Sequence, residues 1–251
     1  MNWWQDVAAF LSTVGAAVGE VITWWRGLAA EQTPTPWTWL TLAFTLTFAS
    51  AFTRIYPRAR HLVTFTHETG HAFIAKLTGR RVAAVRLHTN TSGTTTSIGR
   101  PGISSVLTAA GGYPAPAAAA GLLLAAAITG HTVQAFTLAA LITALVLLVT
   151  RNAWGVLITA GVLAGFLLTF RFAPVAFFGV IAAALAGLLA GGALRDIWTE
   201  RRVRRADPTA STDVASIARS THLPTAATWL GMLLLTVTAF AAPVLLAVSL
   251  R

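Results

Sequence analysis

Apolar residues occupy long, nearly uninterrupted blocks of this chain, and short polar segments separate the blocks. Several blocks reach the ~20 residues that a helix needs to cross a bilayer. The blocks are Trp37 to Thr53, Leu107 to Thr129, Thr132 to Thr150, Ala153 to Phe170, Pro174 to Leu194 and Ala226 to Leu250. This pattern predicts an all-α, multi-pass membrane bundle rather than a water-soluble domain.

The composition agrees with this prediction. Of the 251 residues, 55% are hydrophobic and only 10% are charged, whereas soluble domains carry about 25% charged residues. We expect a multi-pass integral protein of the cell membrane, embedded in the lipid bilayer. Residues 37–251 are assigned to one transmembrane domain, because a bundle in lipid needs no separate cores. Residues 1–36 are assigned to an amphipathic or interfacial helix and a linker, and whether this helix spans the membrane is left open.

The net charge of +10 comes mostly from arginines in the segments between the apolar blocks. Membrane topology explains such charges, so we expect no nucleic-acid partner. The positive-inside rule assigns three segments to the cytoplasmic side. They are the region after residue 80, the turn at Arg151 and a polar loop at about 195–225. Within that loop, Asp213 to Ser220 is predicted as a short helix, preceded by the capping residues Ser211 and Thr212.

The motif His67-Glu68-Thr69-Gly70-His71 lies inside the apolar run from Leu62 to Leu77. A helix brings His67 and His71 to one face, where both imidazoles can bind one zinc ion. Glu68 is then the general base for a zinc-bound water. The chain has no cysteine, which leaves histidines and carboxylates as the metal ligands. The motif therefore predicts zinc as the cofactor, His67 and His71 as ligands and Glu68 as the catalytic residue.

A catalytic zinc usually has three protein ligands. Asp196 is the first candidate for the third position, because it is the acidic residue immediately after an apolar block. Its alternative role is that of a helix-end partner for Arg195 or Arg201. Asn152 is a second candidate, either as a weak ligand through its amide oxygen or as a residue that orients a substrate backbone.

In the segment Arg81 to Ser97, the apolar residues Val82, Val85 and Leu87 and a run of Thr and Ser flank the turn formers Asn90 and Ser92-Gly93. This pattern predicts a β-hairpin at about 81–97. The edge of such a hairpin could pair with an extended substrate segment through backbone hydrogen bonds. A solvated Thr-rich loop is the alternative.

The motif followed by Ala72, together with the later stretch from Ala110 to Pro116, resembles the site-2 protease family of intramembrane zinc metallopeptidases, especially its compact actinobacterial, peptidase M50B-like branch. The similarity extends from about Ala51 to Trp229. The other short segments that resemble this family are Gly79 to Val82, Ser92-Gly93, Ser211-Thr212-Asp213, and His222 to Pro224 with Trp229. The resemblance implies a helical-bundle protease with zinc near the cytoplasmic membrane face and a membrane-embedded hairpin. Site-2 proteases usually carry their third ligand in an Asp-Gly motif, and this chain has no Asp-Gly.

These features predict an intramembrane zinc metalloendopeptidase that hydrolyses peptide bonds of transmembrane or membrane-proximal protein substrates. A substrate helix must unwind to expose its carbonyl. Gly111, Gly112, Pro114 and Pro116 either loosen the neighbouring helix for this purpose or serve tight helix packing. Two other functions stay open: a non-proteolytic membrane scaffold or binding protein that retains the motif, and a cation transporter, although we find no internal repeat. The substrate and the oligomeric state are left open.

Overall fold

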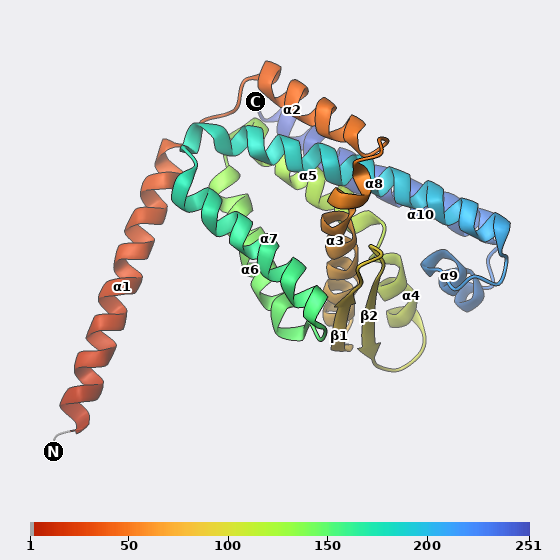
Figure 1. Ribbon diagram of the computed structural model, residues 1–251, viewed down its shortest axis with the longest axis horizontal. Coiled ribbons are helices and arrows are strands. Elements are labelled where there is room, and N and C mark those ends of the chain that lie inside the picture. Colours follow the sequence, from red (N-terminus) through yellow and green to blue (C-terminus); the bar gives the residue numbers. More distant parts are fainter. Residues whose placement is uncertain (1–2) are drawn as a thin grey trace.

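The computed structural model describes residues 3–251 and consists of long helices with one β-hairpin (Figure 1). The helices are α1 (Trp3–Glu31), α2 (Trp37–Ser50), α3 (Tyr56–Leu77), α4 (Ile103–Ala110), α5 (Pro114–Thr129), α6 (Thr132–Val149), α7 (Ala153–Phe172), α8 (Phe178–Ala206), α9 (Asp213–Thr221) and α10 (Thr225–Ser249), with a 3₁₀ turn η1 (Val175–Phe177) before α8. The strands are β1 (Arg81–Leu87) and β2 (Gly93–Ile98). The predicted all-α polytopic bundle with a short hairpin is confirmed.

Helices α2, α5, α8 and α10 form the core of the bundle, with α8 packed against α2 and α5, and α5 against α10. Small residues make these contacts close. Ala120 of α5 and Ala183 and Ala186 of α8 are fully buried. Gly187 of α8 faces the backbone carbonyl of Phe44, where a Cβ atom would collide. Membrane helices commonly pack through small residues in this way, because lipid supplies no hydrophobic drive between them.

Five helical segments of residues 3–251 are long and apolar enough to cross a membrane: α1, α6, α7, η1 with α8, and α10. The pair α4 and α5 would make a sixth span, bent by 57°. The apolar block from Trp37 to Thr53 behaves differently, because only 14 of its residues form α2. At 1.5 Å per residue this helix is roughly 21 Å long, short of the ~30 Å hydrocarbon layer.

Helix α8 also differs from the prediction for its C-terminal end. The polar loop was expected from about residue 195, but α8 continues to Ala206 and α9 occupies residues 213–221. Arginine and glutamate favour a helix, so the charged run extends α8 rather than ending it. The short loop helix itself is confirmed, and Thr212 caps it by accepting a hydrogen bond from the Ala215 amide.

Helix α1 extends away from the rest of the molecule in Figure 1, and none of its described residues is buried. Its contacts with the bundle lie near its C-terminal end. The indole nitrogen of Trp25 donates to Thr137 Oγ1 of α6 at 2.8 Å, and Gln32 Nε2, just beyond the helix, donates to Gln134 Oε1 at 2.7 Å. The side chains in the rest of α1 therefore make no buried contact with the other described helices.

The hairpin pairs β1 and β2 in antiparallel register, with Val85 opposite Thr95. The turn between α6 and α7 covers the other edge of β1. Thr150 forms a parallel bridge with Val85, and the Arg151 amide donates to the Val85 carbonyl at 3.0 Å. Within residues 3–251, β2 has no strand partner other than β1. The hairpin thus keeps one free edge, along β2.

Candidate metal centre

Helix α3 brings the two histidines of the motif together. His67 and His71 are one helical turn apart, and their Nε2 atoms are 3.1 Å from each other. His71 is buried and His67 is partly buried. The Nδ1 atom of His71 lies 2.7 Å from the Thr108 carbonyl oxygen of α4. Because a carbonyl only accepts, Nδ1 carries a proton, and Nε2 is the nitrogen through which a neutral His71 would bind a metal.

The carboxylate that meets the two histidines is that of Asp213, the first residue of α9. Its Oδ2 atom lies 3.1 Å from His67 Nε2 and 3.2 Å from His71 Nε2. These three residues form a group that could hold a metal ion. The predicted ligands His67 and His71 are therefore brought together, and a residue to which the sequence assigned no ligand role joins them.

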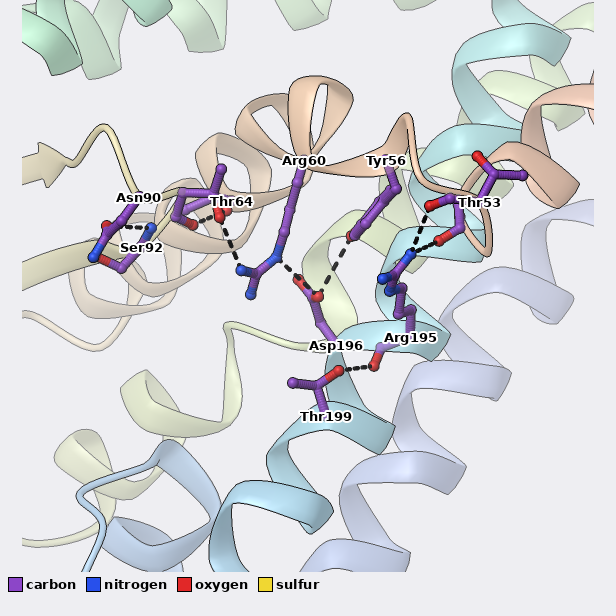
Figure 2. Close-up of polar contacts among 11 residues, drawn as sticks. Thr53, Tyr56, Arg60, Thr64, Asn90, Ser92, Arg195, Asp196 and Thr199 are labelled. Carbon is purple, nitrogen blue, oxygen red and sulfur yellow. Dashed lines mark hydrogen bonds and ion pairs between the residues drawn. The ribbon is translucent and has the colours of Figure 1, made fainter.

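Asp196 lies elsewhere, and the assignment of the third position is corrected. Its Oδ1 atom accepts hydrogen bonds from Arg60 Nε at 3.1 Å and from the Tyr56 hydroxyl at 3.4 Å (Figure 2). Arg60 and Tyr56 belong to the first turns of α3, before the motif. Asp196 thus forms an ion pair with an arginine, which was the alternative to a ligand role. Its partner is Arg60, not Arg195 or Arg201.

Asn152 does not face the histidines either. Its Nδ2 atom donates to the Leu87 carbonyl at 2.6 Å, and its Oδ1 atom accepts from the Leu87 amide at 3.2 Å. Both polar ends of the side chain are therefore engaged by the last residue of β1. Asn152 extends the covered edge of the hairpin and leaves no amide oxygen for a metal.

Helix α9 is held in place by its apolar face, which explains why the sequence alone did not single out Asp213. Val214 and Ile217 pack with Ile197, Trp229 and Met232 in one cluster. In the sequence, Asp213 lies in the middle of a polar segment, whereas Asp196 comes just after an apolar block and was therefore chosen as the candidate ligand. The available signal was an amphipathic loop helix with a capping threonine directly before an aspartate.

The Asp213 carboxyl is held in its ionised form. Burial alone would raise its pKa, but hydrogen bonds with His67 and His71 and the charge of these imidazoles outweigh burial and hold the pKa well below its usual range. An ionised carboxylate is the form that binds a metal.

A break in the helical chain keeps the space beside the histidines open. Gly112 lies in the bend between α4 and α5, and a Cβ atom on it would be 2.5 Å from the Nε2 atoms of both His67 and His71. The ring of Tyr113 packs edge-on against His67, with 4.8 Å between ring centroids. Any side chain at position 112 would fill the space next to the Nε2 atoms of both histidines.

Glu68 is buried against the hairpin, at 4% exposure. The Thr95 hydroxyl of β2 donates to Glu68 Oε2 at 2.7 Å. A Cβ atom on Gly93 of the same strand would lie 2.5 to 2.8 Å from atoms of the Glu68 side chain. Strand β2 therefore lies directly against the Glu68 carboxylate, which follows His67 in α3.

The chain matches one known protein family over most of its length. The model of the family described as Peptidase M50B-like covers residues 37–244. No curated protein and no solved structure matches the chain. The matched range runs from the start of α2 into α10 and includes α3, the hairpin, the bent pair α4 and α5, and α9. Because the match covers most of the chain, the resemblance seen in the motifs is confirmed, and the chain belongs to the Peptidase M50B-like family.

Proposed function

We propose that this protein is an intramembrane zinc metalloendopeptidase of the cell membrane, which hydrolyses peptide bonds in transmembrane or membrane-proximal protein substrates. The observation that carries the proposal is the convergence of His67, His71 and Asp213 in a chain whose Glu68 stands next to the first ligand. Membership of a peptidase family and five helices able to span a membrane support it.

The donor set fits zinc. Zinc lies about 2.0 to 2.1 Å from imidazole nitrogen and about 2.0 to 2.2 Å from carboxylate oxygen, so two ligands of a tetrahedral site are roughly 3.3 to 3.5 Å apart. The three donor atoms here are 3.1, 3.1 and 3.2 Å apart. Two histidines and one carboxylate are also a set typical of zinc hydrolases, which leaves one position for water or substrate. Gly112 leaves space beside both nitrogens.

A bound zinc ion would supply a Lewis acid and lower the pKa of a water molecule toward ~7. Glu68 is the general base: its carboxylate accepts the proton of the attacking water and then delivers a proton to the leaving amine. The hydrogen bond from Thr95 engages Oε2, and Oε1 lies beside Gly93, where the missing side chain leaves it unobstructed. Thr95 thus orients the carboxylate within the site.

The free edge of β2 suits an extended substrate. A peptide that adds to a strand edge binds through its backbone, whatever its sequence. Gly93 and Thr95 of β2 contact Glu68, so a segment paired with β2 would run close to the catalytic carboxylate. The substrate helix must first unwind, since a helix uses its carbonyls in its own hydrogen bonds.

The test combines metal content and cleavage in detergent-purified, full-length protein. We expect near-stoichiometric zinc in the wild type and in Glu68→Gln, and loss of zinc in Asp213→Ala. Asp196→Ala is the matched carboxylate control and should keep zinc. A membrane-protein substrate reconstituted with the enzyme should be cleaved by the wild type and not by Glu68→Gln. A wild type without zinc, or cleavage that survives Glu68→Gln, would overturn the proposal. Zinc binding without cleavage of any reconstituted membrane segment would favour the scaffold.

A further inference from the structure

Glu200 in the last part of α8 is buried, at 4% exposure, and has no part in the proposed reaction. A buried carboxylate is costly unless a hydrogen-bond partner compensates it. The partner of Glu200 is the hydroxyl of Thr212, whose Oγ1 atom donates to Glu200 Oε1 at 2.9 Å. Thr212 directly precedes Asp213 in the chain. The buried charge is therefore joined to the residue next to the carboxylate of the metal centre.

The same hydroxyl caps α9. Thr212 Oγ1 accepts a hydrogen bond from the Ala215 amide at 3.2 Å. A hydroxyl has only one hydrogen. Because Thr212 donates this hydrogen to Glu200, its oxygen can only accept in the second hydrogen bond. The oxygen lone pairs then face the amides of the first helical turn, as an N-cap requires. Glu200 thus sets the orientation of the group that fixes where α9 begins.

Helix α9 depends on such contacts because it has only nine residues, fewer than a helix needs to be stable by itself in water. Ile197 and Trp229 pack against its apolar face. The guanidinium of Arg204 donates to the Ala210 carbonyl at 3.1 Å and holds the loop before it. The apolar contacts decide where α9 lies, and the bond from Thr212 to Glu200 ties its N-terminal end to α8.

We propose that Glu200 is a positioning residue for the metal centre. By accepting the Thr212 hydrogen, Glu200 fixes the first turn of α9 and holds the Asp213 carboxylate opposite His67 and His71. This inference rests on the proposed function, in which Asp213 is a metal ligand. Glu200 acts through Thr212 and touches neither the metal nor the substrate.

The first experiment measures cobalt(II) binding to metal-free, full-length protein by its visible absorption. Glu200→Ala should weaken binding about 10-fold, the lower end of the range for direct hydrogen-bond partners of a ligand, because Glu200 acts through Thr212, and should change the absorption bands. Glu200→Gln keeps an acceptor oxygen and should restore both. Thr199→Ala, a change at the exposed neighbouring position of α8, is the control and should match the wild type. Thr212→Val removes the cap as well and should weaken binding at least as much as Glu200→Ala, and the double variant should lose no more than Thr212→Val alone.

The second experiment needs no metal and follows hydrogen exchange of the backbone amides of α9. Glu200→Ala should speed exchange at residues 213–221, and Glu200→Gln should not. If the wild type bound no cobalt, the proposed function would fail, while exchange in α9 would still decide whether Glu200 holds this helix. Wild-type exchange in Glu200→Ala would overturn the inference. So would fully additive losses of cobalt affinity in Glu200→Ala and Thr212→Val.

Discussion

Arg60 and Asp196 form an ion pair, with 3.1 Å between Arg60 Nε and Asp196 Oδ1, that connects α3 to α8 (Figure 2). The same guanidinium donates through Nη1 to Thr91 Oγ1 in the hairpin turn at 2.9 Å. Thr64 Oγ1, one turn further along α3, donates to the Thr91 carbonyl at 2.8 Å. Asp196 therefore helps to hold the hairpin against α3 through Arg60.

Replacement of Asp196 by alanine should leave the metal content unchanged and lower the free energy of unfolding. The Asp196 side chain is 13% exposed and that of Arg60 33% exposed, so we expect a loss of about 1 to 2 kcal/mol, between the values for surface and buried pairs. Zinc analysis and unfolding in detergent measure the two effects. A double-mutant cycle with Arg60→Ala isolates the pair. Zinc loss in Asp196→Ala would restore Asp196 as a ligand.

Gly112→Ala should abolish zinc binding without unfolding the protein. The added Cβ atom would lie 2.5 Å from the Nε2 atoms of His67 and His71 and would occupy space that the metal needs. We expect at least a 100-fold loss of zinc affinity, on the order of 3 kcal/mol of binding free energy. Gly231→Ala in α10, where no atom lies within 4 Å of the added carbon, is the matched control. Unchanged zinc affinity in Gly112→Ala would contradict the assigned position of the site.

Thr95→Val should reduce peptide cleavage while zinc stays bound. The substitution preserves the shape of the side chain but removes the hydrogen bond to Glu68 Oε2. A hydrogen bond to a charged group contributes about 1.5 to 3 kcal/mol, so the rate should fall roughly 10- to 100-fold. Thr95→Ser keeps the hydroxyl and should retain most of the activity. The idea fails if valine and serine cleave equally fast.

Asn152→Ala should destabilise the hairpin but leave the metal content intact. It removes two hydrogen bonds to the Leu87 backbone and leaves an amide and a carbonyl without partners, which costs about 1 to 3 kcal/mol. Faster hydrogen exchange in residues 81–98, with unchanged zinc, is the expected result. If Asn152→Ala instead lost zinc with normal exchange, Asn152 would act at the metal.

Features that depend on local spacing were predictable from the sequence. An α-helix brings residues four positions apart to one face, so the motif alone determined that His67 and His71 would meet. The apolar blocks likewise predicted the membrane bundle, and the turn formers Asn90 and Ser92-Gly93 between β-forming residues predicted the hairpin. Each of these conclusions needs only neighbouring residues and the geometry of one element.

The choice of the third carboxylate depended on tertiary structure. His67 and Asp213 are 146 positions apart, and Arg60 and Asp196 are 136 apart, so no local period relates either pair. The rotation of α8 directs Asp196 to Arg60, and the docking of α9 on α8 and α10 brings Asp213 to the histidines. A sequence shows which carboxylates exist, but the packing of whole helices decides which one reaches the site, because that packing sums many contacts between distant segments.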